Sequence, residues 1–400
     1  MNKRPKSGKR GPARRSAKAA FTIPDCKRFT GYKPCFPGTR CYEKCVDYDA
    51  IGIRILLVNL DAMGNVLTTT SILPAIKRKY PKSTVTWLTD RSTAPLLQHN
   101  PLVDRIMTWD PESQMILKGM AFDVVMNVDK SRRAGAFVTG IKVPKKFGFG
   151  MNENGQIVPL NKEAYENYLL GLDDEKKFRG NRKTVPQIEC EEFGLTFKRD
   201  EYILNLTPEE KQFCATYRAR HGLPKQDLIV GFNTGCSDLY PNKKMTIDQH
   251  VSLINRLYAV PGVKLVLVGG PEDTARNAEI VRQVGDMVHS TPTSEGVRKG
   301  VGYVDMCDVV ITGDSFGMHI AIGLKKHVIA WFGVSCAPEI DLFDRGIKLV
   351  PEGLACSPCW KKECPFNLEC IQMIDLDKIT VEVKRLAAEK FARRKTVVHA

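Results

Sequence analysis

Short apolar runs separated by helix-compatible stretches recur along the first half of the chain. The runs are rich in β-branched residues and have the length of buried strands. We expect strands at 53–59, 85–88, 103–107 and 122–127, and helices at about 65–79 and 91–98. This alternation predicts right-handed crossover units and a parallel sheet.

The same pattern returns after a polar, mostly helical stretch at 151–200 with a loop around Arg179-Gly180-Asn181. Thr207-Pro208 followed by two acids predicts a helix start, because it combines a cap with proline at the first position. Further strands are expected at 228–232, 263–268, 309–312 and 328–332, and an amphipathic helix at 375–393. The prediction is an α/β protein with two doubly wound, Rossmann-like domains facing a cleft, at 51–215 and 216–400.

Composition excludes several classes of protein. The 400 residues are 43% hydrophobic and 26% charged, which is ordinary for globular proteins and excludes a largely disordered or collagen-like chain. No run of about 18 apolar residues predicts a membrane-spanning helix. The first residues carry no apolar secretory segment, so we expect most of the 13 cysteines to be reduced or metal-bound.

Positive charge is concentrated at the start of the chain. The net charge is +15, and residues 1–20 contain basic side chains but no acid. We predict a disordered basic arm at 1–25, either as a solubilising extension or as a contact to an anionic surface such as the inner membrane. No nucleic-acid partner is expected, because no recognition fold or aromatic interleaving accompanies the charge.

Ligands of open parallel sheets bind beyond the carboxyl ends of the strands, so the loops there are the candidate sites. The loop after the first strand contains Asp61, Gly64 and Asn65 but lacks the spacing of a dinucleotide fingerprint. Gly64 permits close backbone approach at a helix N-terminus, although a tight turn would also explain it.

Two loops of the second half are further candidate ligand sites. Residues 233–244 offer backbone donors, the hydroxyls of Thr234 and Ser237, and the charge of Lys243, which suits a pyrophosphate; an exposed basic loop is the alternative. Residues 312–319 place small residues where a helix begins. A helix cap and a satisfied helix histidine are the alternatives there. The candidates in this loop are Asp314, Ser315, Gly317 and His319.

Together these loops resemble glycosyltransferase family 9, the bacterial ADP-heptose heptosyltransferases. The resemblance covers roughly 52–385. It rests on Leu-x-x-x-Gly-x-Val-Leu-x-Thr-x-x-x-Leu-Pro-Ala at 60–75, Pro81, Trp87-Leu88, Asn100-Pro101-x-Val-Asp104, Gly313-Asp314-Ser315 with His319, and the cysteines of the C-terminal tail.

The resemblance implies a GT-B fold and a metal-independent, inverting transfer from an ADP-sugar, with heptose as the expected sugar. The expected acceptor is a hydroxyl of a glycolipid in lipopolysaccharide assembly, or of a protein, and the expected location is cytoplasmic, with peripheral contact to the inner membrane. Lys243 matches the charge needed by the departing diphosphate, Asp314 the family acid that holds sugar hydroxyls, and His319 the family histidine. Rival interpretations are a nucleotide-sugar epimerase and a non-catalytic nucleotide-sugar or glycan-binding protein.

One departure concerns the general base. The family usually has aspartate where this chain has Asn65, and asparagine cannot take up a proton at neutral pH. Asp61 on the same loop is the expected substitute, and Asp90 and Asp129 are weaker candidates. The donor loop also reads Ser-Phe-Gly where Ser-Gly-x is commoner, so the sugar itself could differ.

Eight cysteines form two groups with short spacings. Four thiolates at such spacings suit zinc or iron in a tetrahedral site, and some protein-modifying heptosyltransferases resemble this in coupling the fold to bound iron. Free thiols or a labile disulfide are the alternative. The first group, in a Cys-rich segment at 26–50, is Cys26, Cys35, Cys41 and Cys45; the second is Cys356, Cys359, Cys364 and Cys370. Four others are expected in the core: Cys190, Cys214, Cys307 and Cys336.

Overall fold

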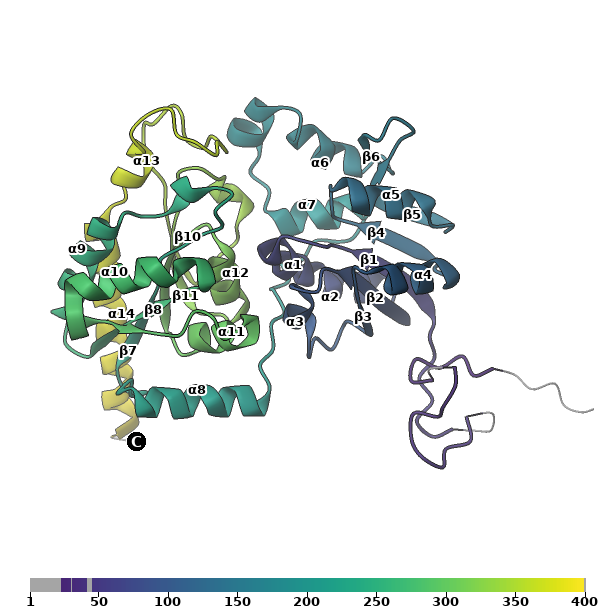
Figure 1. Cartoon of the computed structure of the whole chain (residues 1–400), viewed down its shortest axis with the longest axis horizontal. Coiled ribbons are helices and arrows are strands. Elements are labelled where there is room, and N and C mark those ends of the chain that lie inside the picture. Colours follow the sequence, from purple (N-terminus) through teal and green to yellow (C-terminus); the bar gives the residue numbers. More distant parts are fainter. Residues whose placement is uncertain (1–22, 30, 42–44, 399–400) are drawn as a thin grey trace, which may run out of the picture. The chain divides into compact units, whose positions relative to one another are not determined.

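The computed structural model describes residues 23–29, 31–41 and 45–398, and the chain divides into two compact units, 1–52 and 53–400. The predicted basic arm therefore lies almost entirely outside the described residues. In the described part of the first unit, Cys26 and Ala50 form an isolated antiparallel bridge. The second unit carries both sheets (Figure 1).

The first sheet has six strands in the order β3-β2-β1-β4-β5-β6, and only its last pair is antiparallel. Every strand predicted in this half is present, with ends shifted by at most two residues. The bounds are β1 Ile53–Val58, β2 Ser83–Thr89, β3 Arg105–Thr108, β4 Val124–Asn127, β5 Lys145–Met151 and β6 Ile157–Pro159.

Seven α-helices in the described residues accompany this sheet: five lie between its strands in the chain, and the last two follow its last strand (Figure 1). The predicted helix at 65–79 begins earlier, at Met63, and passes through a 3-10 turn at Thr70–Ile72 before it ends at Lys79 as expected. The predicted helix at 91–98 shortens to a single turn. The bounds are α1 Met63–Thr69, α2 Leu73–Lys79, α3 Ala94–Leu97, α4 Pro111–Gly119, α5 Arg132–Gly140, α6 Ala164–Leu170 and α7 Val185–Glu192.

The second sheet is parallel throughout, in the order β12-β11-β10-β7-β8-β9. Its four predicted strands are all present. The bounds are β7 Leu228–Asn233, β8 Val263–Val268, β9 His289–Ser290, β10 Val309–Gly313, β11 His327–Trp331 and β12 Gly346–Leu349. Two doubly wound sheets confirm the predicted α/β fold class.

Helix ends in the second half follow the capping signals of the sequence. Thr207 and Glu210 form a reciprocal capping box at the start of the first helix, as the sequence predicts. Among the described residues no helix is long and apolar enough to cross a membrane. The bounds are α8 Pro208–Arg220, α9 Ile247–Tyr258, α10 Thr274–Val284, α11 Val297–Asp305, α12 Phe316–Gly323, α13 Glu369–Gln372 and α14 Leu376–Val398.

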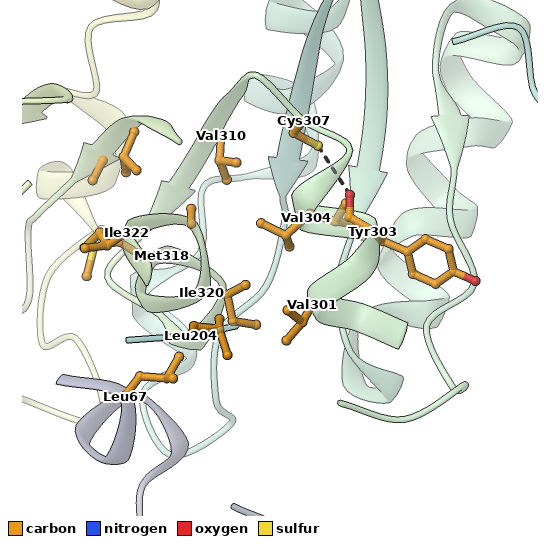
Figure 2. Close-up of a cluster of buried hydrophobic side chains, with 14 of the residues drawn as sticks. Leu67, Leu204, Val301, Tyr303, Val304, Cys307, Val310, Met318, Ile320 and Ile322 are labelled. Atoms are coloured by element: carbon orange, nitrogen blue, oxygen red, sulfur yellow. Dashed lines mark hydrogen bonds between the residues drawn. The ribbon is translucent and has the colours of Figure 1, made fainter. Parts of the chain in front are cut away.

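We call residues 53–206 the N-terminal half and 207–398 the C-terminal half, and the two share a buried cluster. Leu67 of α1 is fully buried in this cluster together with Met318 and Ile320 of α12 (Figure 2). Complete burial of a leucine side chain stabilises a fold by about 1.5–3 kcal/mol. The packing of α1 against α12 therefore sets how the two candidate loops, 60–65 and 312–319, meet.

Candidate active site

A cavity of 510 Å³ opens at the carboxyl ends of the first sheet. Asp61 lines it from the loop after β1, Asn65 from the first turn of α1, and Lys130 from the loop after β4. Glu339 and Trp360 of the C-terminal half complete the lining. The loop that the sequence singles out thus faces a cavity walled by both halves.

Asp61 is an acid of this cavity whose carboxylate is accessible to solvent. Its side chain is 57% exposed, and Arg133 donates to Asp61 Oδ2 at 2.9 Å and to Asp90 Oδ2 at 2.7 Å. Burial and then the charge of Asp129 raise the pKa of Asp61, while Arg133 opposes the rise. A raised pKa and access to the cavity are what a general base needs.

The two weaker candidates for the base are held by other contacts. Asp129 is buried, and its two carboxylate oxygens accept backbone N–H groups of Leu60 at 3.0 Å and Ser131 at 2.7 Å. Asp90 shares Arg133 with Asp61. Both carboxylates shape the loops around the cavity, which leaves Asp61 as the better-placed acid.

Gly64 brings helix α1 against helix α12. A Cβ atom at this position would lie 2.6 Å from His319 Cδ2, so only glycine fits. Thr68 Oγ1 lies 3.2 Å from His319 Nδ1, and the imidazole stacks on Tyr202 with a centroid distance of 6.0 Å. Burial lowers the pKa of His319, against the attraction of Asp314, so this imidazole is neutral near pH 7.

Asp314 and Lys243 form a buried ion pair beside this histidine. Lys243 Nζ lies 2.8 Å from Asp314 Oδ2, and both side chains are 12% exposed. Burial alone would raise the pKa of Asp314, but Lys243 and then His319 hold it below its ordinary value. The structure therefore brings together three of the predicted donor residues, and Lys243 supplies a cation.

Of the remaining predicted donor residues, one is exposed and the others make contacts inside the C-terminal half. Ser237 is exposed, and its Oγ accepts the N–H of Leu239 at 3.2 Å. Thr234 is buried and donates to Asn277 Oδ1 at 2.5 Å, so its hydroxyl serves the fold. Ser315 and Gly317 enclose the side chain of Asn233, whose Nδ2 donates to Ser315 Oγ at 2.9 Å, and a Cβ at Gly317 would lie 2.4 Å from Asn233 Oδ1.

Several residues at the cavity are ones that sequence reasoning missed. Glu189 lines the cavity, and Glu192 lies three residues later on the same helix, α7; both are buried, and burial raises the pKa of each to about 8. Lys130 donates to Asn167 Oδ1 at 2.7 Å, and its pKa is lowered by desolvation. Lys130 directly follows Asp129 near the end of a strand, and this position could have indicated a site residue. The two glutamates lie on a helix whose sequence pattern does not indicate that they are buried.

The structure gives no support to the predicted metal sites. In the part of the chain that the structure describes, no three Cys, His, Asp or Glu side chains are grouped as a metal site. The second cysteine group does line a single cavity of 290 Å³, where burial and then the neighbouring thiols raise the pKa of Cys370 to about 11. In the first group Cys26 is buried and Cys35 exposed. The four cysteines expected in the core are buried there: Cys190, Cys214, Cys307 and Cys336.

Comparison with known proteins points to one family. The sequence model of glycosyltransferase family 9 (heptosyltransferase) matches residues 114–369. Lipopolysaccharide heptosyltransferase 1 of Campylobacter coli is 21% identical over 306 residues, which are 71% of this chain and 84% of that protein. Lipooligosaccharide heptosyltransferase 2 of Campylobacter jejuni is 34% identical over 86 residues, which are 21% of this chain and only 27% of that protein. The solved ADP-heptose lps heptosyltransferase II of E. coli superposes with a TM-score of 0.62 at 17% identity, covering 84% of this chain and 99% of that one.

Proposed function

The chain belongs to glycosyltransferase family 9 and has the family's GT-B fold, and on this premise we propose that it transfers heptose from ADP-heptose to a hydroxyl of a glycolipid in lipopolysaccharide assembly. The observation that carries the proposal is the cavity of 510 Å³, which has Asp61 on one wall and Trp360, which contacts Lys243, on another. The names of the heptosyltransferase relatives support the donor and the acceptor class.

The C-terminal half is proposed to bind the donor. Lys243 offsets the negative charge that grows on the diphosphate as it leaves, and a buried cation does this well because the site needs little reorganisation. Asp314 is proposed to hold the hydroxyls of the sugar, as the family acid does. The neutral imidazole of His319 fixes α12, the helix that follows Asp314, through its contacts with Thr68 and Tyr202.

The N-terminal half is proposed to activate the acceptor. Asp61 takes the proton of the acceptor hydroxyl as the oxygen attacks the anomeric carbon. The bond from that carbon to the phosphate oxygen breaks, and ADP leaves with the electron pair. Attack opposite the leaving group inverts the anomeric centre. Asn65 lines the same cavity but cannot act as the base.

The acceptor and the cellular location are the finer parts of the proposal. A glycolipid acceptor agrees with the lipopolysaccharide enzymes among the relatives, and a protein hydroxyl is the alternative. A cytoplasmic enzyme with its basic arm at the inner membrane would meet a glycolipid where its anionic headgroups lie. Loss of the usual aspartate at Asn65 favours one other function, namely nucleotide-sugar binding without transfer.

Exchange of the proposed base and of its neighbour tests this function. Asp61→Asn should lower the transfer rate from ADP-heptose by about 10²–10⁴-fold but leave the thermal shift produced by ADP intact. Asn65→Asp should keep or raise activity, because it restores the family's usual acid. Asp200→Asn removes a carboxylate that is paired with Arg78 outside the cavity, and it should transfer like the wild type.

Two outcomes would contradict the proposal. Full activity of Asp61→Asn would exclude Asp61 as the base. A wild-type chain that binds ADP-heptose but transfers it to no hydroxyl acceptor, alongside an active Asn65→Asp variant, would instead identify a nucleotide-sugar-binding protein. A screen of ADP-, GDP- and UDP-sugars by thermal shift would name the donor in either case.

A further inference from the structure

The Cys-rich loop at 355–370 places an aromatic ring in the proposed active site. Trp360 lines the cavity of 510 Å³, opposite the loop that carries Asp61. Two ammonium groups lie over its ring: Lys243 Nζ is 4.6 Å from the ring centroid and Lys177 Nζ is 4.8 Å from it. Cation–π attraction acts over such distances, so the ring holds both cations.

Backbone contacts fix the position of this ring. The N–H groups of Cys359 and Trp360 both donate to the carbonyl of Val334, at 3.1 and 2.9 Å. The next residue, Lys361, accepts Asn242 Nδ2 at 2.8 Å through its carbonyl, which ties the loop to the segment that carries Lys243. Trp360 is therefore anchored on both sides along the chain.

The two lysines come from different halves. Lys177 belongs to the π-helical turn Lys176–Gly180 of the N-terminal half, whereas Lys243 belongs to the loop after β7. Two like charges at one ring repel each other, and Lys243 is already paired with Asp314. Glu339 lies in the same lining, where burial raises the pKa of its carboxyl against the opposing charge of Lys177. Two ammonium groups at one ring can each meet one phosphate of a diphosphate.

We propose that Trp360 is a positioning residue that holds Lys177 beside Lys243, so that both ammonium groups meet the diphosphate of the donor. This inference rests on the proposed function and adds a second cation, Lys177, to the donor site. Each lysine binds phosphate as a point charge, and a ring that keeps them in place lowers the ordering cost of binding.

The test compares ADP with AMP, which lacks the second phosphate. Trp360→Leu should weaken ADP binding about tenfold, the scale of a desolvated cation–π contact, and AMP binding by less than about threefold. Lys177→Met should also lose ADP affinity selectively, and the double variant should lose less than the sum of the two single losses, because part of the effect of the ring acts through that lysine. Trp360→Phe should recover part of the ADP affinity. Phe213→Leu removes the ring under Lys299, a separate cation–π pair of α8 and α11, and should leave both affinities unchanged.

The outcomes separate the inference from the function on which it rests. Equal losses of ADP and AMP affinity in Trp360→Leu would show a structural role and overturn the inference, as would wild-type ADP affinity in Lys177→Met. Failure of the wild-type chain to bind ADP at all would refute the proposed function, and with it the need for a diphosphate site.

Discussion

Replacement of Gly64 by alanine tests whether the close approach of α1 to α12 builds the active site. The added Cβ would lie 2.6 Å from His319 Cδ2 and 3.1 Å from His319 Nε2. The imidazole has little room to withdraw, because Tyr202 stacks on it and Thr68 contacts its other nitrogen. One helix must therefore shift.

The expected magnitude is a difference of two opposing effects. Alanine is favoured over glycine within a helix by about 1 kcal/mol. Overpacking of a buried contact costs about 1–3 kcal/mol. For Gly64→Ala we therefore expect a net loss of about 1 kcal/mol in the free energy of unfolding. We also expect slower transfer, because the shift moves Asn65 and Asp61 relative to Asp314.

A second glycine in a helix provides the matched control. Gly300 lies inside α11, and nothing lies within 4 Å of a Cβ built there, so Gly300→Ala should gain stability from helix propensity alone. Urea unfolding of both variants measures the difference, and a transfer assay follows activity. If Gly64→Ala were stabilised as much as Gly300→Ala and kept full activity, the argument from close approach would be wrong.

Two further predictions concern buried charge. Burial raises the pKa of Glu189 and Glu192 from 4.5 to about 8, so between these values the folded chain retains protons that the unfolded chain has released. The free energy of unfolding should therefore fall as the pH rises from about 5 to about 8. The urea midpoint should fall less steeply with pH in Glu192→Gln than in the wild type. Asp314→Asn leaves Lys243 without its buried partner, so it should lower the free energy of unfolding in urea by about 3 kcal/mol and weaken ADP binding. Asp344→Asn removes one partner of an exposed ion pair and should lower the free energy of unfolding by less than about 1 kcal/mol. Equal losses in the two variants would contradict the value for Asp314→Asn.

The strands that the sequence predicts share one property, which is a short segment rich in apolar and β-branched residues without glycine at most positions. β5 was not predicted because Lys145–Met151 mixes two lysines with two glycines. One of these, Gly148, has φ +86°, and a Cβ there would lie 2.0 Å from the carbonyl oxygen of Asn127 on the neighbouring strand. Glycine is thus required by a tertiary contact, and local propensity reads it as a break in the strand.

The site divides along the same line. Asp61, Lys243 and Asp314 could be found from sequence because they follow strand ends, where parallel sheets bind ligands. The parts that were missed depend on segments distant in sequence. Trp360 lies in the loop whose cysteines the sequence analysis considered only as metal ligands, and it lines the cavity. Glu189 is buried by contacts with other elements, and the sequence of its own helix does not predict such burial.

The charges around Asp61 give a physical reason for the presence of Asn65 in place of the family's usual acid. An aspartate at 65 would add a further negative charge to a cavity that already contains Asp61 and Asp129, where the charge of Asp129 raises the pKa of Asp61. The guanidinium of Arg133 donates to both Asp61 and Asp90. Asp61 is then held in place by one hydrogen bond, and its pKa still lies above the ordinary value. A carboxylate whose pKa is raised accepts a proton more readily than one with a lowered pKa, so Asp61, four residues before Asn65 in the chain, is the acid that we propose as the base.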